Sequence, residues 1–153
     1  MTINYVTGDA TQPIGDGNKI IVHICNDVGA WGAGFVVALS RRWRQPEQTY
    51  RNLFRDNTAL KLGDVQLVNV EPDIWVANLI GQRSLAHRDG NPPIRYDAIR
   101  DGLTKLHKEA YQLEASIHMP RIGCGLAGGR WDIIKALIDD TLSGLQVTVY
   151  DLP

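Results

Sequence analysis

The sequence predicts an α/β fold in which a mixed sheet of about six strands lies between two layers of helices. Two observations lead to this prediction. Short apolar runs alternate along the chain with stretches whose apolar residues recur at helical spacing. The run Lys19–Cys25 is apolar over most of its length, which is typical of a strand covered on both faces. The chain has 153 residues, the length of one domain, so we expect a single domain over 1–153.

The first half of the chain alternates between strand and helix signals. A proline at the favoured first position begins the second helix, and Glu71-Pro72-Asp73 reads as a turn that joins two strands in a hairpin-like connection. The predicted strands are Ile3–Val6, Lys19–Cys25, Asp64–Val70 and Ile74–Ile80, and the predicted helices are Gly34–Trp43 and Pro46–Asn57.

The second half begins with a polar loop, Gly81–Pro93, whose length is usual for functional or disordered loops. The segment Ile94–Leu113 carries a helical stripe of apolar residues, and a second stripe begins at Trp131 and ends near Gly144. The remaining predicted strands are Ser116–Pro120 and Gln146–Leu152.

Composition and charge exclude several classes of protein. The formal net charge is −1, so there is no overall basic field of the kind that attracts nucleic acid, and nucleic-acid binding is not expected. The two cysteines form no disulfide framework, and cysteine and histidine lack zinc spacing, so we expect no metal. No signal peptide or membrane-span pattern is present, which favours a cytoplasmic location.

Two glycine-rich segments, His23–Phe35 and Met119–Trp131, are the most informative feature. Each leaves an apolar strand and leads into helix-like sequence. Glycine lacks Cβ, so its loop can bring backbone N–H groups close to an anion. The N-terminus of the following helix adds free donors and the positive end of its dipole. Two such loops in one small domain predict a clamp on a phosphate-bearing ligand.

Three segments, Gly8–Ala10, Cys25–Phe35 and Pro120–Gly129, resemble in this order the motifs of macrodomains, the ADP-ribose-binding α/β/α module. The third resembles the branch that contains terminal ADP-ribose protein glycohydrolase and the macrodomain of a chromatin-remodelling helicase. The pattern His23–Gly34 also resembles a yeast phosphatase that acts on ADP-ribose 1″-phosphate. The resemblance implies a three-layer α/β/α fold and a partner that is ADP-ribose or an ADP-ribosylated protein, with no cofactor.

The resemblance also implies roles for individual residues. Asp9 would accept a hydrogen bond from the adenine amino group, with a turn-forming role as the alternative. The two loops would surround the diphosphate and distal ribose, although Trp31 and Phe35 could equally serve in packing. Cys124 is expected to be a small neighbour of two glycines rather than a nucleophile. The implied ligand-binding residues are Asp9, Ala10, His23, Gly29, Trp31, Gly32, Ala33, Gly34, Phe35, Ile122, Gly123, Cys124, Gly125, Leu126 and Ala127.

The expected reaction is hydrolysis of an ADP-ribosyl bond to an acidic side chain, with Asp89, Asn26 and Gln82 as catalytic residues. Asp89 would orient a water, and Asn26 would bind the distal ribose. Gln82 (or Arg83) and Ala127 stand where the glycohydrolase branch has a lysine and an aspartate, so a Schiff-base route is not expected.

Two alternatives remain open. The first is a phosphatase acting on ADP-ribose 1″-phosphate, in which His23 would take part, although a buried, hydrogen-bonded histidine explains the same residue. The second is a non-catalytic reader of ADP-ribose marks, which the missing lysine and aspartate favour. Arg41, Arg42 and Arg44 are expected to offset a helix dipole rather than to bind nucleic acid.

Overall fold

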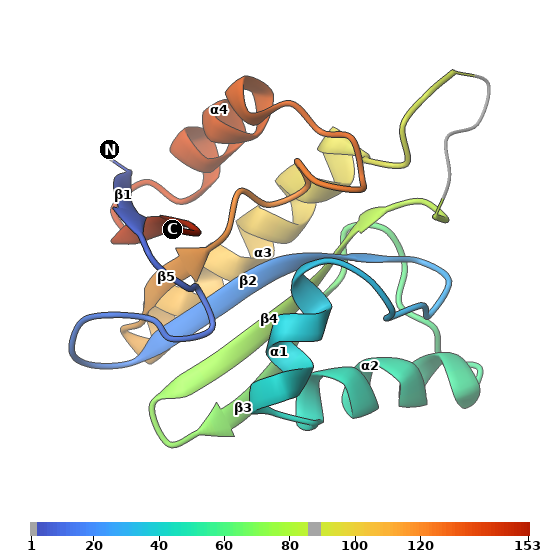
Figure 1. Ribbon diagram of the computed structural model, residues 1–153, viewed down its shortest axis with the longest axis horizontal. Coiled ribbons are helices and arrows are strands. Elements are labelled where there is room, and N and C mark those ends of the chain that lie inside the picture. The colour runs from blue at the N-terminus through green and yellow to red at the C-terminus, as the bar shows by residue number, and fades with distance from the viewer. Residues whose placement is uncertain (1–2, 86–89) are drawn as a thin grey trace.

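The computed structural model describes residues 3–85 and 90–153. In these ranges the order of elements is the one that the sequence predicts (Figure 1). No helix in the same ranges is both long and apolar enough to cross a bilayer. The strands are β1 (Asn4–Thr7), β2 (Lys19–Asn26), β3 (Val65–Glu71), β4 (Ile74–Gln82), β5 (Ser116–Met119) and β6 (Val147–Asp151). The helices are α1 (Phe35–Arg42), α2 (Gln45–Arg55), α3 (Tyr96–Leu113) and α4 (Trp131–Thr141).

Two helices begin later than predicted, each for a local reason. Gly34 has φ 83° and ψ −145°, which is not helical, so α1 begins at Phe35. Ile94 forms an isolated bridge with Gln82, and Arg95 is extended with φ −127° and ψ 104°, so α3 begins at Tyr96. Pairing with a neighbouring strand end therefore overrides the helical pattern at the start of α3.

The strands form one mixed sheet in the order β1-β6-β5-β2-β4-β3. All neighbours are parallel except β3, which pairs antiparallel with β4 after the predicted turn. The carboxyl ends of β5, β2 and β4 consequently share one edge of the sheet. Open α/β sheets bind ligands at this edge, and both glycine-rich loops leave the sheet there.

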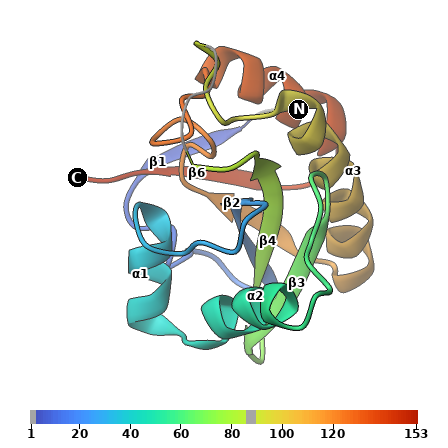
Figure 2. The ribbon, with the colours of Figure 1, turned by 90° about the vertical axis from the view of Figure 1, so that its right-hand side faces the viewer.

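Helices α1 and α2 cover one face of the sheet and α3 and α4 cover the other (Figures 1 and 2). Alternate side chains of β2 point to opposite layers: Ile20 and Val22 belong to the apolar cluster under α3 and α4, whereas Ile21 belongs to the cluster under α1 and α2. All three are fully buried. The strand is thus covered on both faces, as its apolar run predicts.

Candidate functional site

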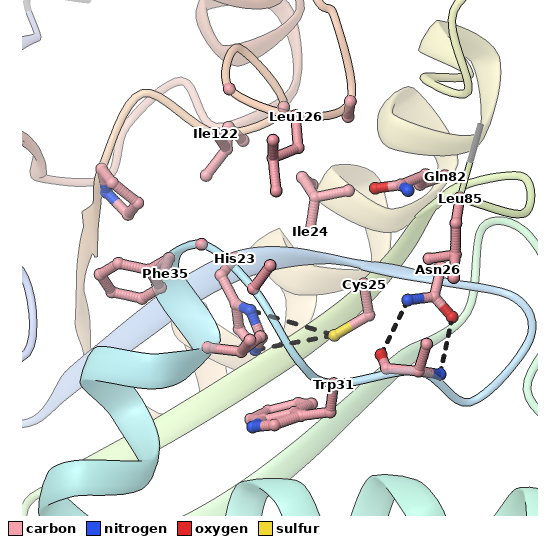
Figure 3. A pocket seen from close by; sticks show the side chains of 18 of the residues that line it. His23, Ile24, Cys25, Asn26, Trp31, Phe35, Gln82, Leu85, Ile122 and Leu126 are labelled. Atoms are coloured by element: carbon pink, nitrogen blue, oxygen red, sulfur yellow. Dashed lines mark hydrogen bonds between the residues drawn. The ribbon is translucent and has the colours of Figure 1, made fainter. Parts of the chain in front are cut away.

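A cavity of about 550 Å³ lies at the carboxyl ends of the central strands, between the loop of residues 27–34 and the loop of residues 120–130 (Figure 3). Its volume falls within the range of small-molecule sites. The sequence-predicted residues that line it are His23, Asn26, Trp31, Gly32, Ala33, Gly34, Phe35, Gln82, Ile122, Gly123, Gly125, Leu126 and Ala127. The two loops therefore form its opposite walls.

Asn26 organises the first loop at the end of β2. Its Oδ1 accepts from the backbone N–H groups of Val28 and Ala30, both at 3.0 Å, and its Nδ2 donates to the Ala30 carbonyl at 2.8 Å. The single proton of the buried Tyr50 hydroxyl is shared between the carbonyl of Asn26 at 2.6 Å and its Oδ1 at 2.8 Å. These bonds fold the loop around the amide, so the geometry favours a structural role. The predicted contact of Asn26 with ribose stays a prediction.

The amino end of α1 adjoins the cavity. Gly34 is the N-cap residue, its positive φ requires glycine, and no side chain caps the helix. The first turn of α1 contains no acidic residue. The uncapped N–H groups and the positive end of the helix dipole are consequently available to an anion in the cavity.

The second loop is held closed by contact between two glycines. The Gly129 N–H donates to the Gly123 carbonyl at 2.7 Å. A Cβ on Gly129 would lie 2.5 Å from that oxygen, so no other residue fits without moving backbone. The Ala127 carbonyl accepts from the Ile94 N–H at 3.2 Å, which ties the loop to the segment before α3. Leu126 is left 72% exposed at the cavity mouth.

Arg121 belongs to the cavity wall, which contains no Asp, Glu or Lys within residues 3–85 and 90–153, but its guanidinium contacts residues that do not line the cavity. The Asp151 carboxylate accepts from its Nε at 2.8 Å and its Nη2 at 3.0 Å, which raises the pKa of Arg121. Its guanidinium also lies over the rings of Tyr5 and Trp131. Sequence reasoning missed Arg121; its position just after a strand, inside a glycine-rich motif, was the available signal.

His23 lies on the cavity floor with its ring buried in the sheet. Asn78 uses its Nδ2 to donate to Gln66 and to the Pro46 carbonyl, so its Oδ1 accepts from His23 Nε2 at 2.5 Å. Burial lowers the pKa of His23 to about 4, and the ring is neutral at pH 7. The thiol of Cys25 lies 3.7 Å from Nε2, and burial raises its pKa. The hydrogen-bonded alternative for His23 is therefore present, although the ring also faces the cavity.

Gln82 ends β4 at the rim of the cavity, where its Nε2 donates to the Ser84 carbonyl at 2.9 Å. The Ser84 N–H donates to Asp27 Oδ1 at 2.8 Å, which ties the segment after β4 to the loop after β2. Asp89, the third predicted catalytic residue, lies outside the described residues. Within residues 3–85 and 90–153, no group of three or more His, Cys, Asp or Glu side chains is placed to hold a metal.

Four predicted ligand residues, Asp9, Ala10, Gly29 and Cys124, are not part of the cavity wall. Asp9 Oδ1 instead accepts from the N–H and the hydroxyl of Thr11, both at 2.8 Å, which is the turn-forming alternative. Gly29 has φ 80° and its Cα faces the Phe54 ring, so its glycine has a packing explanation.

Cys124 directs its thiol to the Ile122 carbonyl at 3.5 Å, and burial raises its pKa, which disfavours a thiolate. The expectation that Cys124 is no nucleophile agrees with this setting. Residues that line the cavity without being predicted are Ile24, Cys25, Ala30, Val36, Leu85, Pro120 and Arg121.

Comparison with known proteins settles the family. No protein-family model matches the chain. A macrodomain protein from Streptomyces coelicolor is 52% identical, covers 98% of this chain and 99% of its own, and superposes with a TM-score of 0.87. The chain is a macrodomain. A protein of unknown function from Bacteroides thetaiotaomicron resembles this macrodomain at 50% identity, with 99% of both chains covered and a TM-score of 0.97. The predicted family and three-layer fold are confirmed.

Curated relatives carry several different names. Chromodomain-helicase-DNA-binding protein 1-like from Danio rerio is 36% identical over 97% of this macrodomain. The macrodomain spans only 15% of that protein and 18% of the mouse relative of the same name. An ADP-ribose 1″-phosphate phosphatase from Lodderomyces elongisporus is 25% identical over 98% of both chains. ADP-ribose glycohydrolase OARD1 from Bos taurus is 25% identical over 98% of this chain and 91% of its own.

Proposed function

We propose that this macrodomain binds ADP-ribose in its cavity and hydrolyses the ADP-ribosyl bond to acidic side chains of modified proteins. The observation that carries the proposal is the pairing of two glycine-rich walls with the uncapped amino end of α1. The described wall holds no carboxylate, which suits a diphosphate. Two relatives of almost the same length are named as enzymes that act on ADP-ribose or its 1″-phosphate.

In this proposal the backbone amides of both loops hold the diphosphate, and the distal ribose lies over the floor near His23. The apolar side chains of Phe35, Ile122 and Leu126 exclude bulk water from the sugar, which strengthens the polar contacts. Asp9 binds the adenine amino group through the carboxylate oxygen that Thr11 does not use. Gln82 contacts the ribose through its amide oxygen.

Hydrolysis follows from position and electrostatics. A water attacks C1″ as the bond from C1″ to the carboxylate oxygen breaks, and the released carboxylate leaves as a stable anion. Loop amides stabilise the negative charge on the phosphates. The proton of the water passes to Asp89 or to a hydroxyl or phosphate oxygen of the substrate. A positioned general base typically contributes about 10²–10⁴-fold, so Asp89→Ala should lower the rate by that order if Asp89 is the base.

The test combines calorimetry with ADP-ribose and incubation with a glutamate-ADP-ribosylated protein. The proposal is supported if calorimetry gives a Kd in the range of a specific ligand and if the incubation releases free ADP-ribose. Tight binding without turnover would make the protein a reader instead, and no heat at millimolar ADP-ribose would remove the binding function. Unchanged hydrolysis by Asp89→Ala would leave a substrate group as the proton acceptor.

A second candidate is hydrolysis of ADP-ribose 1″-phosphate. It is favoured by His23, which lies on the cavity floor, and by the relatives named for this activity. Incubation with ADP-ribose 1″-phosphate distinguishes the two reactions, because this substrate releases inorganic phosphate. Loss of that release in His23→Gln, with retained ADP-ribose binding, would support the phosphatase.

A further inference from the structure

The first glycine-rich loop is held from behind by side chains of α1 and α2. Trp31 donates from its indole Nε1 to Ser40 Oγ at 2.8 Å, and Ser40 donates to Glu47 Oε1 at 3.0 Å. Glu47 Oε2 accepts from Arg51 Nε at 2.9 Å. Arg51 then returns to the loop, donating from Nη1 to the Gly29 carbonyl at 3.3 Å and from Nη2 to the Trp31 carbonyl at 3.1 Å. We call these residues, Trp31, Ser40, Glu47 and Arg51, the Arg51 bracket.

Because each peptide group is planar and trans, the direction of a carbonyl also fixes the direction of the N–H group of the next residue. In a trans peptide the C=O of one residue and the N–H of the next point in opposite directions, and the described chain has no cis peptide bonds. The first contact illustrates the rule: the Gly29 carbonyl points to Arg51, and the following Ala30 N–H points back to Asn26 Oδ1 at 3.0 Å.

The contact between Arg51 and the Trp31 carbonyl affects the ligand site because it sets the direction of the Gly32 N–H. Because the Trp31 carbonyl points to Arg51, the Gly32 N–H points away from α2, and Gly32 lines the cavity. No backbone carbonyl of residues 3–85 and 90–153 accepts from this N–H. A Cβ added to Gly32 would meet nothing within 4 Å, so the space beside the amide is open.

We propose that Arg51 is a positioning residue that aims the Gly32 N–H at the diphosphate of the bound nucleotide. The inference rests on the proposed binding of ADP-ribose. Arg51 is not itself part of the cavity wall; it acts on the ligand site through the loop that it holds. Its guanidinium suits this role because three separate nitrogens in one plane serve the Glu47 carboxylate and the two carbonyls, whereas a lysine would offer a single nitrogen to all three acceptors. Glu47 fixes the fork, and Ser40 fixes Glu47.

The experiment compares Arg51→Ala with Arg55→Ala. Both arginines lie on α2 and border the same surface cleft, but no hydrogen bond or ion pair of the Arg55 side chain occurs within residues 3–85 and 90–153. Arg51→Ala should weaken ADP-ribose binding on the order of tenfold in calorimetry, the effect of losing one charge-assisted hydrogen bond. Arg55→Ala should bind as the wild type does. Arg51→Lys keeps the charge but should not restore the affinity.

A second readout does not need the ligand. In the free protein the amide resonances of residues 29–33 should shift and exchange faster in Arg51→Ala than in Arg55→Ala, while the core strands keep their protection. Failure of the wild type to bind ADP-ribose would refute the proposed function. The amide spectra would still test whether the Arg51 bracket holds the loop. Equal affinity of the two alanine variants, full rescue by Arg51→Lys, or unchanged loop amides in Arg51→Ala would overturn the inference.

Discussion

From two buried histidines we predict that this macrodomain loses stability as the pH falls from 6.5 to about 4. His23 in β2 and His118 in β5 are each 2% exposed. Burial lowers the pKa of both rings from 6.5 to about 4, with the nearby Lys19 ammonium as a second cause at His118. In this window the unfolded chain binds protons that the native state does not, so the free energy of unfolding decreases as the pH is lowered. The loss is complete below about pH 4.

The size of the effect follows from the two pKa values. A tenfold difference in proton affinity corresponds to about 1.4 kcal/mol. The difference between 6.5 and about 4 therefore corresponds to about 3.5 kcal/mol for each histidine once both states are protonated. Together the two rings account for about 7 kcal/mol. Domains are stable by only about 5–15 kcal/mol, so acid should bring this one close to unfolding.

Urea unfolding followed by tryptophan fluorescence measures this dependence between pH 4.5 and 7.5. Near pH 5 the unfolded chain should bind nearly two protons more than the native state. The free energy of unfolding should then change by up to about 2.7 kcal/mol for each pH unit. His23→Gln and His118→Gln should each reduce the slope by about one proton. A wild-type slope below one proton, or ring resonances that titrate between pH 6 and 7, would refute the assignment of both histidines as neutral buried groups.

The same reasoning applies to the cavity, because His23 forms part of its floor. The ring is neutral at every pH well above 4. Its contribution to ADP-ribose affinity should consequently be constant between pH 6 and 8. Calorimetry over this range checks the expectation, and a transition centred near pH 6.5 that disappears in His23→Gln would contradict it.

Three further predictions concern the loops. Gly129→Ala should abolish ADP-ribose binding while the sheet still folds, because its Cβ would lie 2.5 Å from the Gly123 carbonyl oxygen; calorimetry with circular dichroism checks both parts. Tyr50→Phe should lower the free energy of unfolding by about 1–3 kcal/mol, since the Asn26 carbonyl loses its buried donor, and unchanged urea midpoints would contradict this. Asp9→Ala should weaken ADP-ribose binding by about 1.5–3 kcal/mol, and equal calorimetric affinity would remove Asp9 from the site.

The sequence predicts the frame of the site well. Periodicity and turn residues place every strand and helix of the described chain within a few residues of its observed position. The two glycine-rich segments are recognisable because positive φ and close backbone contact leave few alternatives at Gly34, Gly123 and Gly129. The order of the elements then brings both loops to the same edge of a parallel sheet.

Individual side chains are less predictable, since their direction depends on partners that are distant in the sequence. The sequence predicts Asn26 at the ligand site, and it does line the cavity, but only the structure shows that its oxygen also accepts from the Tyr50 hydroxyl and two loop amides. The role of Arg51 needed the tertiary structure, because its acceptors lie 20 and 22 residues away in the loop. The helix pattern of α2 alone gives Arg51 only its i,i+4 pair with Glu47.

The sequence alone determines the local features of the fold. These are the glycines that lack a side chain, the apolar pattern of the strands and the order of the elements along the chain. Which polar groups satisfy one another, and which are left facing the cavity, was decided by folding. Arg121 and Asp151 illustrate the reason: they are 30 residues apart and meet only because β5 and β6 are adjacent in the sheet. A hydrogen bond needs both partners within about 3 Å, and only the assembled sheet sets that distance.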